Sequence, residues 1–156
     1  MARPAPGAGG KPQDIAAAGS LTTDQVFKLG KIATAFTTTH LSALDLSDID
    51  AVYNIAQHSG YSAAQAEAAF TRYLGSTAVS AISSEHLVGL SNFLGGMTTA
   101  QIALIDSTAF TDSVANIGNL TVFSTDQFMA LKEKAVSASG AISTWSTATV
   151  TNVGTV

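Results

Sequence analysis

The chain has 156 residues, of which 46% are hydrophobic and 12% charged, with a formal net charge of −4. Its seven lysines and arginines are scattered, which argues against nucleic-acid binding. With no run of about 20 apolar residues the sequence predicts no transmembrane helix, and with no cysteine it excludes disulfides and thiol chemistry. This length suits one domain with a real core. The low charge leaves a surface of Ser, Thr, Asn and Gln that favours association in lattices, filaments or secreted material.

Residues 1–20 begin with M-A-R-P-A-P-G-A-G-G-K-P, which lacks the apolar centre of a signal peptide, so we expect a disordered arm. From residue 21 the apolar spacing is helical, and glycines mark several helix ends. The predicted helices are residues 22–35, 37–44, 47–57, 62–74, 83–94, 98–105, 111–117 and 124–137.

One six-residue motif recurs before these helices: an apolar residue, Ser or Thr, two variable residues, Gln or His, and an apolar residue. Ser or Thr at the N-cap accepts a bond from a free backbone N–H, and Gln three residues later closes a capping box. His40 and His86 stand where the motif otherwise has Gln, and we interpret them as capping variants. The copies are L-T-T-D-Q-V from Leu21, F-T-T-T-H-L from Phe36, Y-S-A-A-Q-A from Tyr61, I-S-S-E-H-L from Ile82, M-T-T-A-Q-I from Met97 and F-S-T-D-Q-F from Phe123.

The spacing of the copies predicts a tandem duplication of about 60 residues. Copies begin at 21, 36 and 61, then at 82, 97 and 123. This gives a helical domain over residues 21–142 with repeat units 21–81 and 82–142, and a third unit would begin at Ile142. The expected fold is all-α, a compact bundle of short capped helices or a stub of a solenoid.

Residues 143–156 change character, because T-W-S-T-A-T-V-T-N-V-G-T-V is rich in β-branched residues. We expect an extended, strand-like tail that adds to a sheet edge of another subunit, serves as an export signal or is frayed. In the first case its assembly residues are Trp145, Val150, Val153 and Val156.

Candidate chemistry is sparse. Asp45, Asp48 and Asp50 form the one acidic cluster, which favours helix capping and is a weak candidate for Ca²⁺, since it lacks the glycine and final Glu of an EF-hand loop. No G-x-S-x-G surrounds a serine, and no pair of titratable residues is placed for catalysis. We therefore expect a protein that is not an enzyme and has no cofactor.

Two resemblances point the same way. T-T-D-Q-V and T-T-A-Q-I resemble the Thr-rich helical repeats of large bacterial secreted and surface proteins. F-L-G-G at Phe93–Gly96, the following T-x-x-Q-I, and F-M-A-L-K at Phe128–Lys132 are similar to the mesothelin and stereocilin group of extracellular superhelical-repeat proteins. The chain departs from that group in lacking cysteines and a signal peptide. Both resemblances imply non-enzymatic work in adhesion or structural assembly at a surface.

The leading hypothesis is a structural subunit that self-assembles outside the cell into a filament, layer or matrix, with another copy of itself as partner. The alternative is an adhesion or binding module that recognises a glycan or surface protein. The expected location is extracellular or at the cell surface, with a cytoplasmic location as the alternative.

Overall fold

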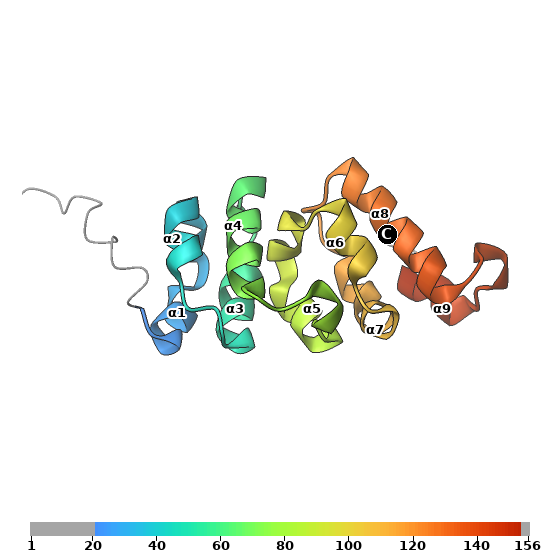
Figure 1. Cartoon of the computed structure of the whole chain (residues 1–156), viewed down its shortest axis with the longest axis horizontal. Helices are drawn as coiled ribbons and strands as arrows, with labels where there is room; N and C mark the ends of the chain where they lie inside the picture. The colour runs from blue at the N-terminus through green and yellow to red at the C-terminus, as the bar shows by residue number, and fades with distance from the viewer. Residues whose placement is uncertain (1–20, 154–156) are drawn as a thin grey trace, which may run out of the picture.

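The computed structural model describes residues 21–153, and side chains as far as Thr151 (Figure 1). The disordered arm predicted for residues 1–20 lies outside this range. Within it every regular element is helical, which confirms the all-α prediction, and no helix is long and apolar enough to cross a membrane. The elements, with η for 3-10 helices, are α1 (Thr23–Leu29), η2 (Gly30–Ala35), α2 (Thr38–Ala43), α3 (Ile49–Ala56), α4 (Ala63–Leu74), η3 (Val79–Ala81), α5 (Ser84–Leu90), η4 (Ser91–Gly96), α6 (Thr99–Leu104), α7 (Ser107–Ile117), α8 (Thr125–Ser139), η5 (Ile142–Thr144) and α9 (Thr147–Val153).

The helices form two rows that run along the long axis of the molecule (Figure 1). One row is α1, α3, α5, α7 and α9, in which each helix packs on the next. In the other row α2 packs on α4, α4 packs on η4, and α6 packs on α8. The fold is therefore the start of a solenoid, in which each element mainly meets its neighbours.

The recurring motif forms the helix starts that its sequence predicts. Complete capping boxes occur at Thr22, Thr37, Ser62, Thr98 and Ser124. At the fourth copy Ser83 accepts the backbone N–H of His86, but the His86 ring turns instead to Tyr73, whose Oη lies 2.7 Å from His86 Nδ1. Each cap stabilises its helix by about 1 kcal/mol.

Two predicted helices are each split in two by a backbone turn. The segment 22–35 divides at Gly30, which has φ +48°, and the segment 83–94 divides at Ser91, which has φ +42°. This left-handed conformation cannot continue an α-helix, so the chain proceeds as η2 and η4. Gly adopts it freely, whereas Ser91 is strained.

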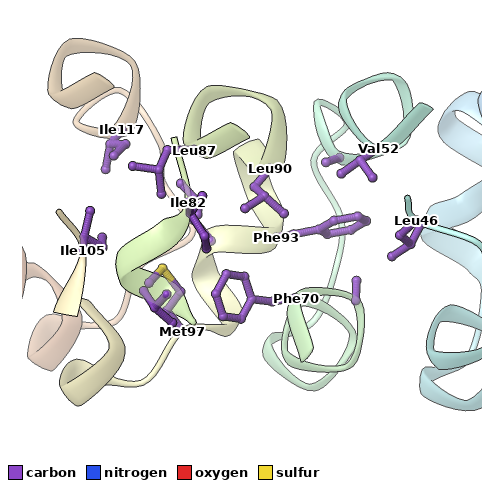
Figure 2. Close-up of a cluster of buried hydrophobic side chains, with 14 of the residues drawn as sticks. Leu46, Val52, Phe70, Ile82, Leu87, Leu90, Phe93, Met97, Ile105 and Ile117 are labelled. Atoms are coloured by element: carbon purple, nitrogen blue, oxygen red, sulfur yellow. The ribbon is translucent and has the colours of Figure 1, made fainter. Parts of the chain in front are cut away.

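One continuous core lies between the two rows. Figure 2 shows Phe70 of α4 beside Phe93 of η4, with Leu90 of the other row next to Phe93, and Leu87 and Ile117 together farther along the core. Phe70, Phe93 and Leu87 are fully buried. A Cβ on Gly96 would overlap the backbone of Ala66 and Glu67, so the absence of a side chain lets η4 lie directly on α4.

The same succession of elements occurs in residues 21–81 and 82–144: a capped helix, a 3-10 turn, a short capped helix, two further helices and a second 3-10 turn. The repeat units 21–81 and 82–142, and their origin by duplication, stay predictions.

The strand-like tail is wrong in form, because residues 147–153 are the helix α9, packed on α7. Ser146 accepts the N–H of Thr149 at 3.1 Å and so starts a helix despite the β-branched residues that follow. Trp145 is partly buried on the core and donates its Nε1–H to the Gly140 carbonyl, and Val150 is exposed. The side chain of Val153 and the whole of Val156 lie outside the described residues.

Candidate binding surface

Two grooves of related composition lie in the α2–α4–α6–α8 row. The first, about 540 Å³, lies between α2 and α4, and the second, about 370 Å³, lies between α6 and α8. The α2–α4 groove is lined by residues that include Thr38, Ser42, Ala64, Glu67, Ala68 and Arg72. The α6–α8 groove is lined by residues that include Thr99, Ala103, Ala130, Glu133, Lys134 and Ser137.

The two grooves correspond at most of their lining positions but not at their carboxylates, since the counterpart of Glu67 is Met129 and that of Glu133 is Thr71. A shift of 61 or 62 residues carries Thr38 to Thr99 and Arg72 to Lys134, and likewise carries the small residue Ala68 of the groove floor to Ala130. Each groove thus offers a floor of Ala, Ser and Thr, with one carboxylate and one cation. The walls carry no aromatic side chain.

The cation of each groove also donates a hydrogen bond to a carbonyl at the C-terminal end of a neighbouring helix. Arg72 Nε donates to the Leu44 carbonyl at 2.7 Å, just past the end of α2. Lys134, which is buried, reaches the Ala103 carbonyl near the end of α6 at 3.4 Å. Positive charge at these helix ends is favourable, because the final carbonyls lack helical partners and carry the negative end of the dipole.

In each unit a glutamine in the first turn of α4 or α8 ties that helix to the preceding 3-10 turn, η2 or η4, and to the residue that follows this turn. Gln127 Oε1 accepts the Ser124 N–H at 2.7 Å, and its Nε2 donates to the carbonyls of Gly95 and Met97 at 2.9 and 2.6 Å. In the first unit Gln65 makes the equivalent bonds to Ser62, Thr34 and Phe36. We call this arrangement the glutamine clasp. It fixes α4 and α8, and with them one wall of each groove.

In the acidic cluster predicted from the sequence, Asp45 and Asp48 accept backbone N–H groups, and the three carboxylates do not meet at a common site. Asp48 Oδ1 accepts the N–H groups of Asp50 and Ala51 and so begins α3. Asp45 accepts from Ser47, and these bonds hold the pKa of its carboxyl below the usual range. Across the described part of the chain no three Asp, Glu, His or Cys side chains are grouped to hold a metal ion.

Two tyrosines at the junction of the units are perturbed by burial, which raises their pKa values. Tyr61 donates to the Ile55 carbonyl at 2.9 Å and packs edge-on against Phe93. Tyr73 pairs with His86. Burial disfavours the charged phenolate, and because each hydroxyl already has a structural partner, both tyrosines act in packing the units together.

None of the predicted site residues whose side chains the structure describes lines either groove. Trp145 lies between η5 and α9, and Val150 lies on α9, at the far end of the molecule. The grooves had a signal in the sequence that was not used: small residues follow one another along α4 at Ala64, Ala68, Thr71 and Gly75, the spacing of one helix face.

Two comparisons found no match: no protein-family model fits the chain, and no solved structure is similar to it. Among curated proteins the chain is similar to otoancorin from Mus musculus, with 32% identity over 133 residues, and to otoancorin from Homo sapiens, with 33% identity over 133 residues. Each match covers 84% of this chain but only 12% and 11% of the relatives. The chain therefore spans about an eighth of these proteins.

The otoancorin match agrees with the resemblance to the mesothelin and stereocilin group, at the level of distant homology. It does not bear on the bacterial Thr-rich repeats, which stay a prediction.

Proposed function

We propose that this chain is a non-enzymatic, extracellular helical-repeat module that binds a surface or matrix protein through the α2–α4 and α6–α8 grooves. The observation that carries the proposal is the occurrence of a groove of related composition at the same place in both units. A ligand that engages both grooves gains affinity from the second contact, because that contact is intramolecular.

The chemistry of the grooves favours a protein ligand. Polypeptide backbone and short side chains suit a floor of Ala, Ser and Thr with hydroxyls along its edge. Glu67 with Arg72, and Glu133 with Lys134, offer both signs of charge beside these floors. Sugars often stack on aromatic rings, which the groove walls lack.

The extracellular location is supported by the weakly charged, hydroxyl-rich sequence and by the distant similarity to otoancorin. Self-assembly into a filament or layer is the second candidate function, favoured by the 12% charge content, which leaves little repulsion between copies. It no longer has a strand-exchange mechanism, since the tail is α9.

The test is binding of the labelled chain to extracellular matrix isolated from epithelial cells, with tryptophan introduced into each groove. Ala64→Trp and Ala103→Trp change exposed groove residues, and Ala115→Trp on α7 is the matched exposed control. We expect saturable binding, lost after protease treatment of the matrix, weakened by either groove variant and retained by the control.

Binding that does not saturate, or that the groove variants leave unchanged, would contradict the proposal. Loss on periodate treatment instead of protease would assign the grooves to a glycan. Growth of large particles in light scattering of the unmodified chain would favour the second candidate.

A further inference from the structure

The last described residues repeat the opening of the second unit. Where the first unit passes into the second, Ala81 N–H bonds the Ala78 carbonyl at 2.9 Å, and Ile82 N–H bonds the Val79 carbonyl at 3.1 Å. The same two bonds recur 63 residues later. Thr144 N–H bonds the Ala141 carbonyl at 2.8 Å, and Trp145 N–H bonds the Ile142 carbonyl at 3.2 Å.

The helix start that follows is repeated at the same offset. Ser83 accepts the N–H of His86 at 3.3 Å, and its counterpart Ser146 accepts the N–H of Thr149 at 3.1 Å. The new helix α9 packs on α7, as α5 packs on α3. The third repetition of the pattern therefore begins at Trp145, and not at Ile142 as the sequence suggested.

The apolar residues of this third start differ from their counterparts in exposure. Val79 and Leu87 are 6% and 0% exposed, whereas their counterparts Ile142 and Val150 are 55% and 50% exposed. Ile82 is 3% exposed, and its counterpart Trp145 is only partly buried. The same three positions are thus buried at the junction of the two units and more exposed at their counterparts near the end of the described chain.

The second unit shows what covers these positions. Ile82 lies beside Met97, and Leu87 lies near Ile105 and Ile117 (Figure 2). These covering residues follow α5 in the chain, on η4–α6–α7, and α6 also packs on η3. The first elements to cover these positions are therefore a 3-10 turn and a short capped helix, η4 and α6.

We propose that Ile142, Trp145 and Val150, which we call the C-terminal face, bind a further helical unit that presents a 3-10 turn and a capped helix of the η4–α6 kind. The interface would continue the one already formed by η3 and α5 with η4, α6 and α7. Residues 141–153 carry no charged side chain, so an apolar partner meets no unpaired charge there. This inference does not depend on the grooves.

The test extends the chain, so that residues 1–153 are followed by a second copy of residues 91–144. Trp145 is the single tryptophan of the extended chain and reports on the C-terminal face. We expect its emission to move to shorter wavelength, its quenching by acrylamide to fall several-fold, and helical ellipticity to increase in proportion to the added residues.

Two variants of the extended chain localise the effect. Val150→Asp places a charge in the proposed interface and should restore the quenching seen in the unextended chain. Leu104→Asp in the first copy, at a residue that is 60% exposed on α6, is the matched control and should not. The unextended chain with Val150→Asp should keep its fold, because that residue is already at the surface.

An added segment that is helical while Trp145 stays accessible would overturn the proposal, and so would an added segment that stays unfolded, since no face would then have received it. A blue shift of Trp145 in the unextended chain at rising protein concentration, together with a dimer mass, would also overturn it by assigning the face to a second copy. Groove-dependent matrix binding is unaffected by any of these outcomes.

Discussion

Replacing Gln127 with alanine tests the glutamine clasp. Gln127 is 9% exposed and makes three hydrogen bonds, to Ser124 N–H and to the carbonyls of Gly95 and Met97. At about 1 kcal/mol of net stabilisation for each bond, the loss is about 3 kcal/mol. This is a large share of the roughly 5–15 kcal/mol by which domains are usually stable.

Gln101 is the matched control, because it has the same place in the motif without the long-range bonds. Its Oε1 accepts the Thr98 N–H at 2.8 Å, so Gln101→Ala should cost about 1 kcal/mol, the value of the cap alone. Gln127→Glu separates the two functions of the side chain. It keeps an acceptor for Ser124 but sets a carboxylate against two carbonyls, so it should destabilise at least as much as alanine.

The assay is urea unfolding of the whole chain, monitored by circular dichroism. The free energies of unfolding are compared between variants for which this free energy has the same slope against urea concentration. The reasoning is refuted if Gln127→Ala costs no more than Gln101→Ala, because the carbonyls of Gly95 and Met97 would then be satisfied equally well without the clasp.

Three further predictions use the same assay. Gly96→Ala should cost about 1–3 kcal/mol, because the new methyl overlaps the Ala66 backbone and separates α4 from η4; an unchanged midpoint would show that η4 can shift freely. Ser91→Gly should stabilise by about 1 kcal/mol, since Gly30 holds the corresponding turn in the first unit without strain, and a loss of stability would count against strain at this position. Asp106→Asn should weaken the dependence of the free energy of unfolding on pH in acid. Backbone N–H donors lower the pKa of Asp106, so its contribution to stability is present above the unfolded value of 3.8 and is lost as pH falls through the folded pKa. Stability curves of variant and parent that stay parallel below pH 4 would contradict this.

Sequence reasoning succeeded where the physics is local. A capping box involves residues three positions apart, so the helix starts at Thr22, Thr98 and Ser124 can be predicted from the sequence alone. It failed at residue 147 onward because the alternation of Thr and Val suggested a strand, and because Thr149 stands where the motif otherwise has Gln or His. The cap at Ser146 then went unrecognised.

The start of α7 was missed for a related reason. The helix was expected at residue 111 but begins at Ser107, where Asp106 caps it through the N–H groups of Thr108 and Ala109. A capping aspartate outside the recurring motif was not considered. The grooves belong to another class of feature, because α2 and α4 meet only through the tertiary fold, and their shared wall cannot be located without it.

The arrangement of helices in rows has a mechanical consequence. Helices α1 and α9 lie at opposite ends of the long axis (Figure 1), so a pulling force applied at these ends passes through the junctions between units in series. In a series the weakest junction sets the force at which the first unit detaches. Unravelling about 60 residues then releases roughly 200 Å of chain. A protein attached at both ends would unfold one unit at a time and extend before either attachment broke.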